Sequence, residues 1–337
     1  MAGTLARKAK LQLLYRGVDL GGYCTGATFT DQAHGLGDEI RATLEDREFK
    51  WQGPWAPRTG EKVAAQINCF DWPAPGQTMR LNCGIFQIGE PRLYGPPDMV
   101  EITGVSVNVT GSARTQTKSK NWEMVNLAGI AAHVAANSGL GLHFTGVNPD
   151  YEIVAQRGES DLAFLLRLAK AAGNSVKAAD GKLIVYSGAA WDAQPPAATL
   201  TRGEAWIERY DFKGKTDDKY KGCVCNYWHP YLKQHIKGEF FPPNAPTTGE
   251  ILRITSPVKD QAEAVAKATA ALRSKNRRQV EANFELMGHP GRRAAQVLAV
   301  KGFGRYDIKY FVDRAEHRLD SNGGYTTTLE MRGSLPY

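Results

Sequence analysis

The hydrophobic pattern changes its period along this chain, and that change limits the fold more than any other feature of the sequence. Near the start, apolar residues recur at every second position, and the same alternation returns around Val105 to Val109: Ala9, Leu11, Leu13, Tyr15, then Val105, Val107, Val109. A period of two is that of β-strands with one face on a core. Turn clusters near residues 53–54, 71–73 and 94–97 separate these runs. About the first 110 residues therefore predict a small antiparallel barrel or sandwich.

A helical period replaces the alternation in the middle of the chain. After a polar connector over residues 112–121, we expect a helix from about Trp122 to Ser138, and a second from Asp161 to Ala172 with Ser160 as its N-cap. The second helix carries one apolar stripe, formed by Leu162, Leu165, Leu166 and Ala169. A strand over residues 182–186 follows. Residues 111–195 thus predict an α/β module.

Strands return after the linker at residues 193–197. We expect them at residues 223–228 and 295–302, and by alternation at Ile308, Tyr310, Val312 and at Tyr325, Thr327, Leu329, Met331. One helix, about 257–275, interrupts them, with Ser256 as N-cap and Val258, Ala262, Val265 and Leu272 as its buried stripe. The predicted fold class is mainly β with an α/β insertion (α+β): two small antiparallel β-barrels, over residues 1–110 and 196–337, flank the module.

Neither end of the sequence nor its cysteines point to secretion. The 337 residues suggest about two domains, the first residues lack a signal-peptide apolar stretch, and no window approaches the roughly 20 apolar residues of a membrane helix. The five cysteines are odd in number and irregularly spaced, which fits a reducing compartment better than a disulfide framework. We expect a soluble protein made in the cytoplasm, without a membrane partner.

The sequence offers only weak candidates for a catalytic, cofactor-binding or metal site. The sequence has no phosphate-binding loop, no Gly-x-Ser-x-Gly and no His-Glu-x-x-His, so we assign no catalytic residue and no cofactor. Cys223 and Cys225, with His229 and His235, form the sharpest metal candidate, because thiolate and imidazole suit zinc. A gap of one residue is shorter than structural zinc sites use, so core packing of the cysteines is the preferred interpretation. We assign no metal, and the question stays open at this point.

Other polar and aromatic residues have plain structural interpretations beside their functional ones. A turn or core-edge position explains His133 and His289 better than a catalytic role does. Four carboxylates could form pairs for glycoside cleavage, but helix N-terminal charge and a polar turn are the preferred interpretation: Glu159, Asp161, Asp217, Asp218. Trp51, Trp55 and Trp72 have the rings to stack on a sugar or base, but covering one end of the first barrel is the preferred interpretation.

Four stretches, taken together, resemble a known family. They are residues 38–46 with 50–55 and 60–63, residues 120–122 with 139–142, residues 157–169 with 173 and 180–183, and residues 310–317 with 324–329. In this order they are similar to the late control gene D family of contractile-tail phages, the baseplate hub proteins. Relatives occur in R-type bacteriocins (tailocins), and type VI secretion spikes resemble the family in their N-terminal half. The likeness covers nearly the whole chain and rests on packing patterns, not on a reactive site.

The resemblance implies a structural protein without enzymatic activity. It implies a homotrimer whose two barrels per subunit make a pseudo-six-fold ring, joining a six-fold tail tube protein to a trimeric central spike protein. Because nothing follows the second barrel at Tyr337, we expect the spike to be a separate chain, as in a phage or bacteriocin hub. Tape-measure and baseplate wedge proteins are further candidate partners. Assembly in the bacterial cytoplasm and a final location in the tail baseplate are implied as well.

The net charge of +7 is concentrated in one part of the chain. Between Arg253 and Arg318 lie 14 Lys and Arg against 7 Asp and Glu, which accounts for the whole excess. Four of these cations end the predicted helix, as Arg273, Lys275, Arg277 and Arg278. There they either face the helix dipole as a solvated end or form a basic patch for an acidic protein neighbour.

Two other functions remain as alternatives. The charge suggests a nucleic-acid-binding or regulatory late-gene protein, but no reading motif is present, so we expect no specific nucleic acid. A tail-associated cell-wall hydrolase is the other, since tail tips often carry one.

Overall fold

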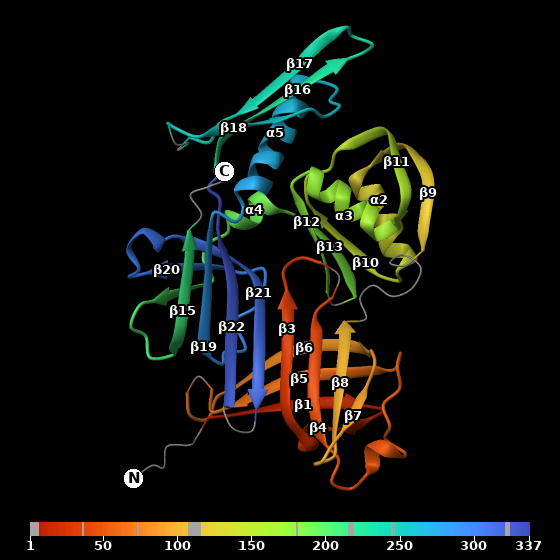
Figure 1. Ribbon diagram of the computed structural model, residues 1–337, viewed down its shortest axis with the longest axis vertical. Coiled ribbons are helices and arrows are strands. Elements are labelled where there is room, and N and C mark those ends of the chain that lie inside the picture. Colours follow the sequence, from red (N-terminus) through yellow and green to blue (C-terminus); the bar gives the residue numbers. More distant parts are fainter. Residues whose placement is uncertain are drawn as a thin grey trace.

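The computed structural model describes residues 7–35, 37–72, 74–106, 116–179, 181–214, 219–243, 245, 247–320 and 324–337. Figure 1 shows two β-regions in the lower half, with a helical module and a separate arm above them. Within the described ranges, no helix is both long and apolar enough to cross a membrane.

The first β-region is built from the alternating segments near the start of the chain. Its strands are β1 (Lys8–Tyr15), β2 (Val18–Asp19), β3 (Cys24–Gln32), β4 (Glu39–Glu45), β5 (Lys62–Phe70), β6 (Thr78–Ile88), β7 (Arg92–Tyr94) and β8 (Met99–Ser106), with 3-10 turns η1 (Gly21–Tyr23) and η2 (Lys50–Gln52). On β1 the predicted alternation is confirmed, because Leu11, Leu13 and Tyr15 are buried. The core-facing position expected for Val105 is wrong: on β8 Val105 is 39% exposed and the neighbouring Ser106 is buried. The predicted strand residues Val107 and Val109 lie outside the described residues.

The second β-region is built from strands between Ala198 and Gly333. They are β14 (Ala198–Thr201), β15 (Ile207–Gly214), β19 (Val280–Met287), β20 (Val297–Lys301), η3 (Gly304–Tyr306), β21 (Lys309–Asp320) and β22 (Gly324–Gly333). The predicted buried face of β22 is confirmed, because Tyr325, Thr327, Leu329 and Met331 are all buried. The alternation expected at Ile308, Tyr310 and Val312 is wrong in part. Ile308 precedes the strand and is exposed, and Phe311 is buried along with both its neighbours, next to a register shift after Val312.

The two β-regions share one hydrogen-bonded ladder. β3 pairs antiparallel with β21 from Gln32 opposite Arg314 to Gly26 opposite Asp320. The described residues thereby form a 14-stranded sheet with the order β15-β19-β22-β21-β3-β4-β8-β6-β5-β1-β2 along its main path. Leu319 and Tyr325 of the second region also pack in the core of the first. The predicted fold class, mainly β with a helical insertion, is confirmed, and the two β-regions are more tightly joined than the sequence indicated.

The helical module lies between the two β-regions in sequence and above them in Figure 1. Its elements are β9 (Thr117–Asn126), α2 (Leu127–Asn137), β10 (Gly141–Thr145), β11 (Asp150–Ser160), α3 (Asp161–Ala171), β12 (Asn174–Ala179), β13 (Lys182–Ser187) and α4 (Gly188–Asp192). The predicted helix α3 is confirmed, including Ser160, whose hydroxyl accepts a hydrogen bond from the Ala163 amide.

The start of the first module helix was predicted wrongly. Residues 122–126 are part of strand β9, which pairs with β11 as a two-stranded ribbon, and residues 117–121 of the predicted connector belong to the same strand. The helix begins only where the Asn126 side chain accepts the Gly129 amide. Trp122 points inward and stacks on Phe164 of α3, so its apolar position imitates a helical stripe.

The arm is a small unit of its own at the top of Figure 1. Strands β16 (Tyr220–His229), β17 (Gln234–Phe240) and β18 (Glu250–Ile254) form a sheet covered by α5 (Gln261–Asn276). The strand at residues 223–228 is confirmed. The N-cap of the helix is Asp260, not Ser256, and the buried stripe is Ala264, Ala268, Leu272 and Asn276, with Ala262 exposed. Starting the helix four residues later rotates the face that meets the sheet.

Candidate functional site

The cysteine and histidine candidates are spread along one strand. Cys223 and Cys225 are fully buried between β16 and α5. Burial raises the pKa of Cys223 to about 11 and also raises the pKa of Cys225. His229 lies at the far end of the strand, where its Nδ1 accepts the Leu232 amide at 3.2 Å. No group of three metal-ligating side chains occurs in the described part of the chain.

The structure divides the four predicted patch residues into two inward and two outward cations. Arg273 Nη2 lies 2.6 Å from Asp192 Oδ2, and Arg277 Nη2 lies 3.3 Å from Asp313 Oδ1. Lys275 is exposed, and Arg278 is 70% exposed and 3.8 Å from Glu281. Arg273 and Arg277 therefore serve contacts inside the molecule, and only Lys275 and Arg278 present charge to solvent.

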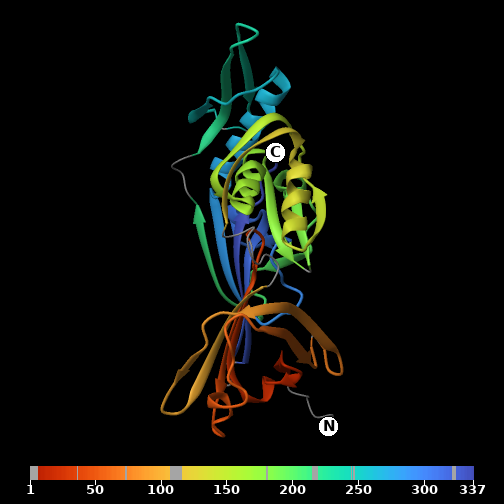
Figure 2. The same ribbon diagram turned by 90° about the vertical axis from the view of Figure 1, so that its right-hand side faces the viewer.

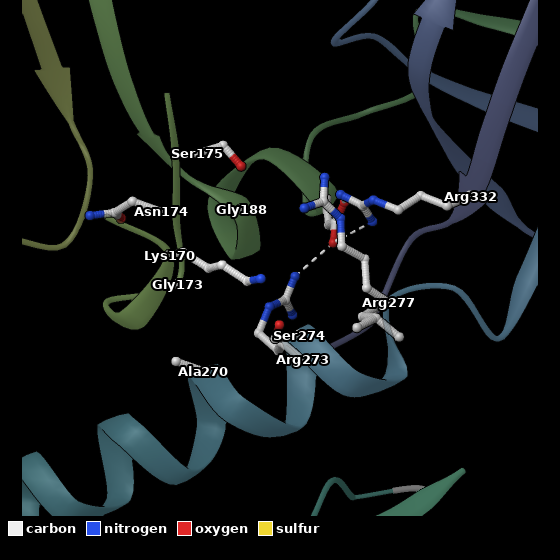
Figure 3. A pocket seen from close by; sticks show the side chains of 12 residues that line it. Lys170, Gly173, Asn174, Ser175, Gly188, Ala270, Arg273, Ser274, Arg277 and Arg332 are labelled. Atoms are coloured by element: carbon white, nitrogen blue, oxygen red, sulfur yellow. Dashed lines mark hydrogen bonds and ion pairs between the residues drawn. The ribbon is translucent and has the colours of Figure 1, made fainter. Parts of the chain in front are cut away.

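The inward arginines belong to a charged junction, which we define as Asp192, Arg273, Arg277, Asp313 and Arg332. Figure 3 shows its three arginines. Asp192, at the end of α4, also contacts Arg332 of β22 at 3.0 Å, and Arg332 Nε lies 3.4 Å from Asp313 of β21. The side chains of Asp192 and Arg332 are 1% and 4% exposed. The junction thus ties three units together: the module, the arm helix and the second β-region.

A neutral histidine completes this junction. His34 follows β3, and its Nδ1 lies 3.0 Å from the Tyr186 hydroxyl, which itself donates to the Ala33 carbonyl. Nδ1 therefore donates, while Nε2 lies against the Arg277 guanidinium and 3.2 Å from Asp313 Oδ1. Burial, then the nearby arginines, lower the pKa of His34 to about 2, so the ring stays uncharged beside these cations.

A second buried network fixes the module to the first β-region. Lys177 of β12 lies 2.5 Å from Asp31 of β3 and 3.6 Å from Asp38. Asp31 also accepts the Ala294 amide at 3.1 Å, and Asp38 accepts the Gln32 amide at 3.0 Å. Burial raises the pKa of Asp38 to about 6, although Lys177 opposes this. Both networks are internal and polar, and they set the relative positions of the units.

The remaining polar candidates have structural partners. Glu159 binds Arg167 at 2.5 Å. Asp161 is fully buried and binds Lys118 at 2.6 Å; burial alone would raise its pKa, but hydrogen bonds from Lys118 and Gln156 lower it overall. His133 contacts Trp122 edge to face, and His289 Nδ1 accepts the Gly291 amide in its turn. Asp217 and Asp218 lie outside the described residues.

The tryptophans pack in the first β-region, as the preferred interpretation held. Trp51 and Trp72 are 3% and 5% exposed, and Trp55 packs against the same core. Trp51 Nε1 donates to the Glu45 carbonyl at 3.0 Å, and Trp72 contacts Tyr325 of the second region. None of the three presents an open face for stacking.

A cluster of exposed apolar side chains lies at the end of the arm. We call it the hairpin tip, residues 226–236, where β16 and β17 extend beyond β18 (Figures 1 and 2). Trp228, Tyr231 and Leu232 are 49%, 93% and 54% exposed. The tip is nevertheless ordered by contacts, because Trp228 packs edge to face on His235 and the ladder continues to His229 opposite Gln234. Exposed Trp and Tyr on an ordered element are typical of protein interfaces.

Sequence reasoning missed the junction almost completely. Asp192, Asp313 and Arg332 are far apart in sequence and belong to no motif. One signal was available for Arg332, a charge directly after the apolar alternation of Tyr325 to Met331. The hairpin tip also had a signal, in the aromatic residues between Tyr227 and Tyr231.

Known proteins similar to this chain are tail proteins. No protein-family model matches it. A probable baseplate hub protein of Escherichia phage 186 is 23% identical over 353 residues, covering 91% of this chain and 87% of that protein. A tail protein from Neisseria meningitidis has a similar structure, with a TM-score of 0.70, 17% identity and 96% of each chain covered. A component of the Escherichia coli type VI secretion system, described as structurally similar to T4 bacteriophage tail proteins, has a TM-score of 0.59 and 12% identity, covering 96% of this chain and 76% of that one.

These similarities agree with the motifs quoted from the sequence. The hub protein is aligned over most of both chains, and the two structures share the fold over nearly all of this chain. The predicted resemblance is confirmed: over almost its whole length, the chain is similar to the baseplate hub proteins of contractile tails.

Proposed function

We propose that this protein is the structural baseplate hub of a contractile tail, in a phage or an R-type bacteriocin, and that it joins a trimeric central spike to a six-fold tail tube. The observation that carries the proposal is the alignment with a probable baseplate hub protein over 91% of this chain. The proposal includes a homotrimer, a mature location in the tail baseplate, and no catalytic role.

The internal construction of the chain suits a part that bears load. A pull on one β-region is passed to the other through the β3–β21 ladder, whose backbone hydrogen bonds act together. The module and the arm are fixed to this sheet by buried ion pairs through Asp192 and Lys177. Breaking such a pair leaves a buried charge without its partner, which is strongly unfavourable.

The surfaces suit assembly with other proteins. The hairpin tip offers apolar side chains and free strand edges, and edges of this kind are normally covered in an assembly. Lys275 and Arg278 are exposed cations for an acidic neighbour.

The proposal is tested by mass photometry of the purified chain, alone and mixed with separately purified tube and spike proteins from the same gene cluster. We expect a species of three times the subunit mass, and larger complexes with both partners. A chain that stays monomeric and binds neither partner contradicts the proposal. A parallel assay on purified peptidoglycan should show no cleavage, and cleavage would instead support the hydrolase alternative.

A further inference from the structure

A cavity of about 110 Å³ lies beside the charged junction, where the module, α5 and β22 meet. Its charged lining consists of Lys170 from α3, Arg273 and Arg277 from the end of α5, Arg332 from β22 and Asp192 from α4. Ser274 adds a hydroxyl. The cavity is therefore lined by more cations than anions.

The excess charge is not balanced by nearby carboxylates. Besides Asp192, the acid in contact with these cations is Asp313, which binds Arg277 and Arg332. Four cations thus face two carboxylates, and the low pKa of His34, caused first by burial, keeps its ring uncharged. In the described ranges Lys170 makes no ion pair. Lys170 is exposed and Arg273 is 12% exposed, so the site is partly open to solvent. Its excess of positive charge attracts an anion.

One buried donor atom at the cavity lacks an acceptor. Arg273 uses Nη2 for Asp192, while its buried Nη1 has no hydrogen-bond acceptor among the described residues. Lys170 and Ser274 line the same cavity as Arg273 (Figure 3). Two cations that line one small cavity repel each other, and an anion between them would relieve that repulsion.

We propose that this cavity binds a small dianionic oxyanion of the phosphate or sulfate class, held by Arg273, Lys170 and the Ser274 hydroxyl. Guanidinium and hydroxyl donors match the oxygen atoms of such an ion, and the volume exceeds that of a few water molecules. The ion would link α3 of the module to α5 of the arm and neutralise the end of the junction. This site is separate from the proposed hub function and does not depend on assembly.

The test is isothermal titration of the purified full chain with sodium phosphate and with sodium sulfate at constant ionic strength, set with sodium chloride. We expect saturable binding of about one ion per chain. Lys170→Ala should weaken the affinity by about tenfold or more, the loss of one charge-assisted contact. Lys275→Ala is the control, because this lysine is exposed on α5, the helix of Arg273, but does not line the cavity. The affinity of this variant should be unchanged.

Two further measurements complete the experiment. Phosphorus NMR of the phosphate titration should show line broadening that Lys170→Ala removes, and circular dichroism should show that this variant is folded. Sodium acetate, as a carboxylate probe, should bind at least about tenfold more weakly than sulfate, since it carries one charge. Absence of saturable binding, equal affinities of the wild type and Lys170→Ala, or acetate binding as tightly as sulfate would each overturn the proposal.

Discussion

At the scale of single residues, Asp192 is the point at which the internal charges meet. Its carboxylate serves both Arg273 and Arg332, and its side chain is 1% exposed. Asp192→Asn should therefore leave the buried Arg273 guanidinium without its carboxylate and Arg332 with Asp313 alone. We expect the free energy of unfolding to fall by about 3–5 kcal/mol. Urea denaturation followed by circular dichroism measures this. The exposed Asp150→Asn should shift stability by less than about 0.5 kcal/mol, and a similar loss in both variants would count against the junction.

His317 makes a second prediction, which concerns pH. It is fully buried on β21, where this strand pairs with β3. Its ring lies near Phe29, and its Nδ1 is 2.8 Å from the Tyr325 hydroxyl. Burial lowers its pKa to about 4, while Asp31 opposes and Arg293 reinforces this. The unfolded chain, with a histidine pKa near 6.5, binds more protons than the folded chain between pH 6.5 and about 4. Stability from this residue is thus complete above pH 6.5 and is lost as the pH falls, by up to about 3 kcal/mol.

The measurement is urea unfolding across pH 4 to 8 for the wild type and His317→Gln. The variant should show a flatter dependence on pH below 6.5. Asp38 works in the opposite direction, because its folded pKa of about 6 lies above the ordinary carboxyl value, so its contribution falls as the pH rises through that range. Asp38→Asn should steepen the acid loss. Parallel curves for wild type and His317→Gln would contradict the assignment.

Two of the four predicted patch residues are exposed, so a test of the basic patch as a protein-binding surface needs only two substitutions. Lys275→Glu with Arg278→Glu reverses the exposed charges and spares Arg273 and Arg277, which hold the junction together. We expect unchanged thermal stability and reduced incorporation into tails, measured by counting intact particles in electron micrographs. Normal particle numbers would show that Lys275 and Arg278 are only a solvated helix end and not a binding surface.

At the scale of elements, the sequence correctly predicted those strands and the helix whose apolar residues lie on one buried face. β1, β22 and α3 are of this kind, and Ser160 caps α3 as its position indicated. β9 was missed because its ribbon covers α3 through Trp122 while most of its residues stay exposed, so its spacing carries no period of two. The start of α5 was misplaced since Ser256-Pro257 imitates a helix start four residues before the true cap, Asp260.

The arm depends on the close approach of β17 to α5. A Cβ atom at Gly238 would lie 2.4 Å from the Ala264 carbonyl carbon, which is backbone and does not yield. Gly238→Ala should therefore separate the helix from its sheet and speed amide hydrogen exchange in α5 and β17, without affecting β5. Gly22→Ala, where a Cβ meets nothing within 4 Å, is the control and should leave exchange unchanged in both. Equal exchange in the two variants would contradict the packing.

At the scale of the whole molecule, the β3–β21 ladder and the shared core make the two β-regions one unit. The sequence could not show this, because strand pairing between segments so far apart leaves no local signal. From the ladder and the shared core we predict that residues 1–110 produced alone do not fold. The fragment exposes the β3 edge and lacks Leu319 and Tyr325 in its core. The fragment should aggregate or give a disordered circular dichroism spectrum. A folded monomeric fragment would show that the regions are independent.

The same ladder has a consequence for how the protein is made. His34 and Asp313, which meet beside it, are 279 positions apart. At roughly 5–20 residues per second, a ribosome needs about 15 to 55 s to pass from one to the other. During that interval the edge of β3 has no partner, and the nascent first region is open to pairing with other chains or to capture by a chaperone. Completion of this fold is therefore a late event of synthesis, reached only when the last strands emerge.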